Sequence, residues 1–126
     1  MPFEDYDQFK LLSQGFEDTG VRAYKGQVGK LVDAPKILTA VITIHSVEAR
    51  HAAIVRRLND LQGWIPNDQP GVPKAVAPIY AGMDETNNFG VDVPAVSFVE
   101  AKQVTGAFDE PLDKQAVLDI VSPFLA

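Results

Sequence analysis

Cysteine is absent from the sequence. This absence excludes disulfides, thiolate catalysis, zinc knuckles and iron–sulfur clusters, so a metal ion would have to be bound by carboxylate, imidazole or carbonyl groups. A long apolar segment is also missing, because the longest run without a charged side chain, 37–47, falls well short of the roughly 20 residues of a transmembrane helix. We therefore expect no membrane partner.

Basic side chains are outnumbered, with 11 lysines and arginines against 17 aspartates and glutamates and a formal net charge of -6. This balance disfavours binding to nucleic acid, and we expect no such partner. The basic segment that opens a secretory signal is missing too, because Glu4, Asp5 and Asp7 follow Met1 closely. A cytoplasmic protein is expected if Met1 is the native start, whereas a chain cut from a longer precursor would leave the compartment open.

The 126 residues, 46% of them hydrophobic, are enough to bury one core and too few for two independent domains. We expect a single domain over 1–126, of the all-α class. Apolar residues recur at helical spacing over 3–31 and again from Asp33 to about Leu61, which predicts two long helices. Since the connection between them is short, 1–62 should form an antiparallel hairpin.

Individual residues predict where the second helix begins and ends. Asp33 can cap it, with Pro35 in the first turn, and Gly63 supplies a left-handed stop after it. The remaining part, 63–126, is predicted to contain, in chain order, an irregular proline-rich arm over 64–78, a loop over 80–94, a short helix over about 95–105 and a final helix from Pro111.

The second predicted helix carries a seam of residues separated by alternating steps of four and three, the pattern of a helix bundle. Glu48 and His51 are polar members of this seam, at i and i+3 on an otherwise apolar face. Burying an ionised carboxylate is costly without a partner, so this pair is a candidate Glu-x-x-His half-site for a metal ion. Alternatively, Glu48 pairs with an arginine and His51 is an ordinary interface histidine. The seam comprises Ile37, Val41, Ile44, Glu48, His51, Val55 and Leu58, and the candidate arginines are Arg22, Arg50 and Arg56.

Other polar residues lie close to this pattern. Glu17 has mostly apolar neighbours on its helix face and could point inward, or it could form an ordinary solvated pair with Asp18, which is spaced for an ion pair with Arg22. His45, one turn before the Glu-x-x-His pair, is a candidate second ligand or hydrogen-bond donor to a ligand, and otherwise a packed helix residue. Tyr24 could donate to a ligand carboxylate or be an ordinary core tyrosine.

Three segments, FEDTGVRAYKG (16–26), IHSVEARHAA (44–53) and AFDEPL (107–112), resemble the ferritin-like domain of bacterial proteins related to the plant desiccation-related proteins. The first two segments are similar to the third and fourth helices of that domain, and the last is similar to its C-terminal segment. The resemblance therefore implies a half-domain that contains only the second pair of bundle helices.

The resemblance also implies a metal site and a partner. In ferritin-like proteins two helices each give one glutamate and two each give a Glu-x-x-His pair, and together they bind a di-iron or di-manganese centre. By resemblance, Glu17, Glu48 and His51 are the ligands that this chain supplies. A homodimer would complete the four-helix bundle and supply four carboxylates and two histidines. The alternative partner is a missing N-terminal half.

The sequence leaves more than one function open. The first is a ferritin-like metal-binding protein with a dinuclear iron or manganese site between two chains and an oxidase-type or stress-protective role, its status as an enzyme being undecided. The second is a non-enzymatic helical structural or stress-related protein whose metal site is degenerate. A third is an interaction module that uses the proline-rich residues 66–78 as a strap on a partner.

Overall fold

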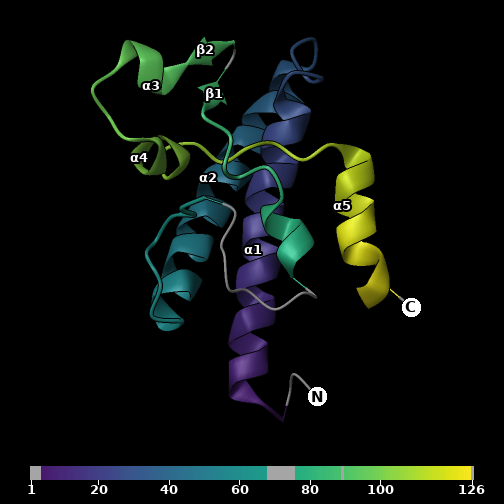
Figure 1. The fold of residues 1–126 in the computed structure, drawn as a ribbon. Helices are drawn as coiled ribbons and strands as arrows, with labels where there is room; N and C mark the ends of the chain where they lie inside the picture. Colours follow the sequence, from purple (N-terminus) through teal and green to yellow (C-terminus); the bar gives the residue numbers. More distant parts are fainter. Residues whose placement is uncertain (1–3, 68–75, 89, 126) are drawn as a thin grey trace. The chain divides into compact units, whose positions relative to one another are not determined.

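The computed structural model describes residues 4–67, 76–88 and 90–125. Helices dominate this part of the chain, and the only strands in it are two residues long, which confirms the predicted all-α class (Figure 1). Within these residues no helix is long and apolar enough to cross a bilayer. The elements are α1 (Tyr6–Val28), α2 (Pro35–Leu58), the 3-10 helix η1 (Ala77–Tyr80), β1 (Asn87–Asn88), β2 (Val91–Asp92), α3 (Val93–Val96), α4 (Ala101–Thr105), α5 (Lys114–Val121) and the 3-10 helix η2 (Ser122–Phe124).

The chain divides into two compact units. The first, here called the helical unit, comprises Met1–Gly63 and Pro111–Ala126, and the second, the connecting unit, comprises Trp64–Glu110. The final helix α5 therefore groups with α1 and α2, although it is far from them in sequence. The expectation of a single domain over 1–126 stays a prediction.

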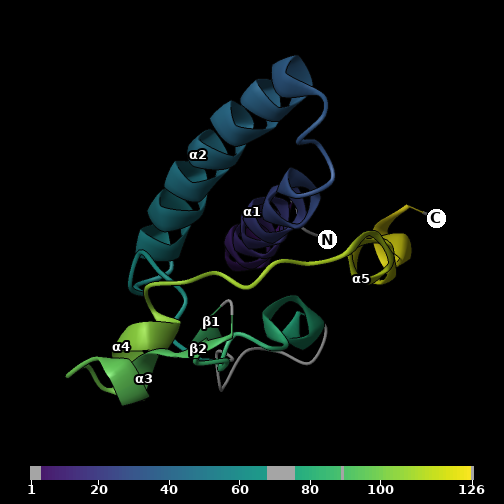
Figure 2. The same ribbon diagram turned by 90° about the horizontal axis from the view of Figure 1, so that it is seen from above.

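In the helical unit, α1 and α2 pack together as the predicted antiparallel hairpin (Figures 1 and 2). α1 begins after Asp5, whose carboxylate accepts hydrogen bonds from the backbone N–H groups of Asp7 at 3.0 Å and Gln8 at 3.1 Å. These bonds satisfy donors that a helix start leaves unpaired. α1 ends at Val28 with Gly29 as its C-cap, a few residues earlier than the sequence predicted.

The start of α2 corrects a predicted cap. Its N-cap is Ala34, which makes no side-chain capping bond, and Pro35 is its first residue. The residue before a proline is disfavoured in the helical conformation, so the cap position falls on the residue immediately before Pro35. Asp33 lies one position too early, and the prediction that it caps this helix is wrong.

The end of α2 corrects a second expectation. The chain turns at Asp60, which has a left-handed φ of 59°, whereas Gly63 is not among the residues with positive φ. The Leu61 N–H donates to the Arg56 carbonyl at 3.0 Å, and the Asp60 N–H donates to the Arg57 carbonyl at 3.1 Å. This is the bond pattern of a Schellman motif, in which aspartate here takes the place of the usual glycine.

The segment before α5 runs across α1 instead of forming the first turn of the final helix. α5 begins at Lys114, and the Asp113 carboxylate caps it by accepting from the Ala116 N–H at 2.8 Å. The Leu112 N–H donates to the Arg22 carbonyl at 3.1 Å. A Cβ on Gly26 would overlap the Leu112 carbonyl, so glycine is needed for this close approach. The prediction that the helix begins near Pro111 is therefore three residues early.

The connecting unit is built from short elements. β1 and β2 pair in antiparallel fashion, and Gly90, with a φ of 83°, lies in the turn between them. The helix predicted over about 95–105 is divided into α3 and α4. α4 begins at Ala101 because Glu100 and Gln103 form a capping box, each side chain accepting from the backbone N–H of the other residue.

Contacts between its two ends stabilise the connecting unit. The Asn67 N–H donates to the Thr105 hydroxyl at 3.2 Å, and that hydroxyl donates to the Asn67 side-chain carbonyl at 3.1 Å. A Cβ on Gly106 would lie 2.9 Å from Cδ1 of Trp64, so the indole packs directly against the glycine backbone. Of the proline-rich arm predicted over 64–78, residues 68–75 lie outside the described residues.

Candidate metal centre

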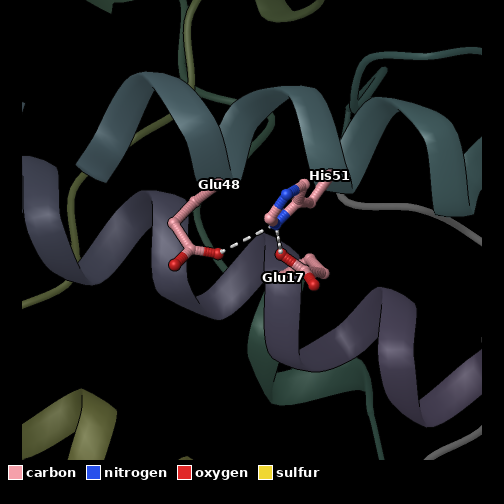
Figure 3. Close-up of side chains that lie close together, drawn as sticks. All are labelled: Glu17, Glu48 and His51. Carbon is pink, nitrogen blue, oxygen red and sulfur yellow. Dashed lines mark ion pairs between the residues drawn. The ribbon is translucent and has the colours of Figure 1, made fainter. Parts of the chain in front are cut away.

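The α1–α2 hairpin brings the predicted site residues together. Glu17 comes from α1, whereas Glu48 and His51 come from consecutive turns of α2 (Figure 3). One ligand atom from each of the three residues lies within 4.8 Å of the other two. The pairing of the two helices therefore joins residues more than 30 positions apart into a group that could hold one metal ion.

The imidazole of His51 lies near both carboxylates of the cluster. His51 Nδ1 lies 3.4 Å from Glu17 Oε2 and 3.9 Å from Glu48 Oε2, and both carboxylates point toward this nitrogen (Figure 3). The Glu17 and Glu48 side chains are 26% and 28% exposed, and that of His51 is 56% exposed. The carboxylates are thus half-buried between the helices, while the imidazole lies at the edge, where an ion could enter from solvent.

The electrostatics of the cluster favour a cation. Burial raises the pKa of the Glu17 carboxyl above its ordinary value, the hydrogen bond to Glu48 and the negative charge of Glu48 raise this pKa further, and His51 lowers it. The Oε2 atom of Glu17 is buried and accepts no hydrogen bond from the described residues, although His51 Nδ1 lies 3.4 Å away. A metal ion between the carboxylates would neutralise their repulsion and bind this oxygen, so the residues suit a divalent cation.

Arginine does not pair with Glu48, contrary to one alternative that the sequence left open. In the described part of the chain, none of Arg22, Arg50 and Arg56 forms an ion pair with this carboxylate. Arg56 instead binds Asp18 on α1, with Nη1 3.0 Å from Oδ2. The negative charge of Glu48 is therefore left for His51 or for an added cation.

Sequence reasoning missed the Asp18–Arg56 ion pair. One of the two alternatives placed Asp18 in a solvated pair with Glu17, yet the Asp18 side chain is 2% exposed and that of Arg56 is 1% exposed. Arg56 is also fixed by a hydrogen bond from Nε to the Gln62 carbonyl at 3.0 Å. A usable signal was the four-residue spacing of Glu48, Ala52 and Arg56, which places all three on the helix face that α1 covers.

The predicted seam of α2 is only partly buried. Ile37, Ile44 and Leu58 are 57%, 39% and 54% exposed. The reason is that α1 covers the neighbouring face, which runs through residues such as Leu38, Ala52 and Arg56. Large apolar side chains of both helices consequently remain exposed within the described chain: Tyr6, Phe9 and Phe16 on α1, and Ile37, Ile42, Ile44, Ile54 and Leu58 on α2.

Two further candidates lie outside the cluster. His45 is half-buried, and its Nε2 atom has no hydrogen-bond partner among the described residues, but it does not join the group formed by Glu17, Glu48 and His51. Tyr24 makes no hydrogen bond to either glutamate in the described structure and instead lines a pocket beside α5. Neither residue supplies a ligand atom to this group.

The part of the chain that forms the hairpin is similar to a known protein family. Residues 1–60 match the family model of the ferritin-like domain. No curated protein and no solved structure matches the chain. The matched region contains α1 and α2 and hence Glu17, Glu48 and His51, so the family likeness and the cluster fall on the same part of the molecule.

Proposed function

We propose that the hairpin is a ferritin-like metal-binding module in which Glu17, Glu48 and His51 bind iron or manganese. The observation that carries this proposal is the convergence of three ligand atoms within 4.8 Å in a cluster with more carboxylates than cations. Oxygen and imidazole ligands suit Fe²⁺ and Mn²⁺, whereas the soft thiolate ligands that select other metals are absent from the sequence. The match of residues 1–60 to the ferritin-like family supports the same assignment.

A dinuclear site would need ligands from a second copy of the chain. One chain offers two carboxylates and one imidazole in this group, so two copies offer four carboxylates and two imidazoles, the set that ferritin-like centres use. The exposed apolar stripe of Ile37, Ile44 and Leu58 beside the cluster supports such a partner, because a monomer would leave it in water. A homodimer is therefore our preferred assembly, and a separate N-terminal half of the domain is the alternative partner.

The chemistry that such a metal supplies is redox cycling with oxygen or peroxide, consistent with an oxidase-type or stress-protective role. The protein would contribute three things. The carboxylates of Glu17 and Glu48 would hold the ion and stabilise its higher charge, the imidazole of His51 would be the third ligand, and the partly exposed edge at His51 would admit small molecules.

Titration with Mn²⁺ tests the assignment. Free Mn²⁺ gives a sharp electron paramagnetic resonance signal that is lost on binding, so the full chain should reduce this signal in proportion to its concentration. Glu48→Gln should weaken binding by at least about tenfold, since even loss of an outer-shell partner costs that much. Asp119→Asn, a matched change at an exposed position of α5, should leave binding unchanged. Equal binding by both variants would refute the site.

A non-enzymatic structural role is the second candidate function. It is favoured by one observation: His51 Nδ1 lies 3.4 Å from Glu17 and 3.9 Å from Glu48, so the three side chains can contact one another without a metal. In that case Glu48→Ala would alter stability and leave the metal content of the purified protein unchanged. The role of residues 66–78 as a strap on a partner stays a prediction, because most of this segment lies outside the described residues.

A further inference from the structure

A pocket lies between α1 and α5 in the helical unit and shares no residue with the metal cluster. Its volume is about 230 Å³, and α5 lies beside α1 in both views (Figures 1 and 2). The pocket is lined by Ala23, Tyr24, Gln27, Lys114, Val117 and Leu118.

Contacts outside the lining hold the two helices in this arrangement. Before α5, the Leu112 N–H donates to the Arg22 carbonyl, and Gly26 lets the Leu112 backbone approach α1. After α5, the ring of Phe124 packs edge-on against Phe16 with ring centroids 5.1 Å apart. These contacts hold α5 against α1 near both of its ends, on either side of the pocket.

The polar groups of the pocket are all free to donate hydrogen bonds. The side chains of Tyr24, Gln27 and Lys114 have no hydrogen-bond or ion-pair partner among the residues that the structure describes. A phenol, an amide and an ammonium group can each donate, and the ammonium group carries a positive charge. A lysine without an ion-pair partner among the described residues of the lining favours a ligand with an anionic group.

The other lining side chains indicate the character and size of the rest of the ligand. Ala23, Val117 and Leu118 present methyl and methylene groups, so the body of the ligand should be apolar. A cavity of about 150 Å³ holds the six carbons of benzene, and about 230 Å³ is therefore enough for about nine carbons. Among the described lining residues Lys114 alone is cationic, so a ligand with one negative charge matches the pocket better than a dianion.

We propose that this pocket binds a medium-chain carboxylate, with its alkyl chain against Val117 and Leu118 and its carboxylate on the Lys114 ammonium group. Tyr24 and Gln27 also line the pocket, and their side chains can donate hydrogen bonds to a polar group of the ligand. The ligand site is independent of the proposed metal function, because the two sets of residues do not overlap.

Calorimetric titration of nonanoate into the metal-free full chain tests this proposal. We expect saturable binding of one nonanoate per chain. Val117→Trp fills the pocket and should abolish binding, whereas Gln115→Trp, at an exposed position of the same helix, should preserve it. Ala23→Leu narrows the same pocket from the side of α1 and should also weaken nonanoate binding. Because this change does not touch α5, a loss of binding in both variants cannot be due to local unfolding of α5.

Charge variants test the anionic part of the ligand. Lys114→Glu should weaken nonanoate binding by about tenfold, because a charged hydrogen bond is replaced by repulsion. Lys36→Glu, on the exposed surface of α2, should leave it unchanged. The pocket assignment is overturned if nonanoate does not saturate or if Val117→Trp and Ala23→Leu bind it as the wild type does. Equal affinity of the pocket for 1-nonanol and for nonanoate would overturn the assignment of a carboxylate group to the ligand.

Discussion

Glu17 and Asp18 are neighbours on α1, yet they lie in opposite electrostatic environments. Asp18 is buried, and Arg56 Nη1 lies 3.0 Å from its Oδ2 atom, so this negative charge has a cationic partner inside the protein. Glu17 lies beside a second carboxylate, Glu48, and a single imidazole, that of His51. The first group is balanced within the chain and the second carries excess negative charge. This comparison indicates that charge balance, more than burial or proximity, separates a structural ion pair from a site that needs a cation.

The largest effect should come from breaking the balanced pair. Arg56→Met removes the guanidinium group that binds the buried Asp18 carboxylate and should lower the free energy of unfolding by about 3–5 kcal/mol. Urea denaturation followed by circular dichroism measures this change. Arg57→Met, at the exposed next position, should stay within about 0.5 kcal/mol of the wild type. Equal stability of the two variants would show that the buried pair is not structural.

Adding metal should stabilise the unbalanced cluster. At a Mn²⁺ concentration of about 100 times the dissociation constant, the free energy of unfolding should rise by about 2.7 kcal/mol, because only the folded hairpin assembles the site. Glu48→Gln should lose this stabilisation, whereas Arg57→Met should retain it. Thermal denaturation with and without Mn²⁺ measures the difference. A comparable rise in the Glu48→Gln variant would place the bound metal elsewhere.

Removing the His51 imidazole should have a smaller energetic effect, which is a weaker affinity for the metal. His51→Gln leaves both carboxylates in place and should weaken Mn²⁺ binding by about tenfold, or about 1.4 kcal/mol. In the metal-free protein the same change should raise the pKa of Glu17 further, since His51 lowers it. Carboxyl chemical shifts followed through a pH titration measure this pKa. An unchanged pKa would mean that the imidazole and Glu17 do not interact in solution.

The smallest effect is expected on the pH dependence of the free energy of unfolding of the metal-free chain. Because the pKa of Glu17 is raised in the folded state, its stabilising contribution is complete below the ordinary value of 4.5 and is lost as the pH rises through the raised pKa. Glu17→Gln cannot ionise, so this variant should gain stability relative to the wild type as the pH rises from 4.5 to neutrality. Asp119→Asn should follow the wild type. Parallel curves for Glu17→Gln and the wild type would contradict the raised pKa.

Helical periodicity was sufficient to predict the hairpin and the shared face of Glu48 and His51. Two long apolar patterns joined by a short connection place α1 beside α2, and Glu48 and His51 share a face because i and i+3 positions do so in any helix. The placement of Glu17 opposite them also required the family resemblance, since its own pattern was compatible with a solvated surface. The metal itself, and the second copy, stay predictions.

Features that depend on tertiary contacts were not predicted. The Asp18–Arg56 pair joins residues 38 positions apart, and local spacing within one helix cannot indicate such a partner. The late start of α5 follows from the passage of Leu112 over Gly26, which no local pattern encodes. The left-handed conformation at Asp60 was missed because Gly63 offered the more usual stop.

The most direct test of the account is the metal content per chain, measured together with the oligomeric mass. The full chain would be loaded with ferrous iron without oxygen, desalted and analysed for metal, and its mass determined by light scattering. The account predicts a dimer that retains about one iron per chain, as expected for a dinuclear site shared by two copies. A protein that retains no metal would show that the excess negative charge of Glu17 and Glu48 does not form a metal site.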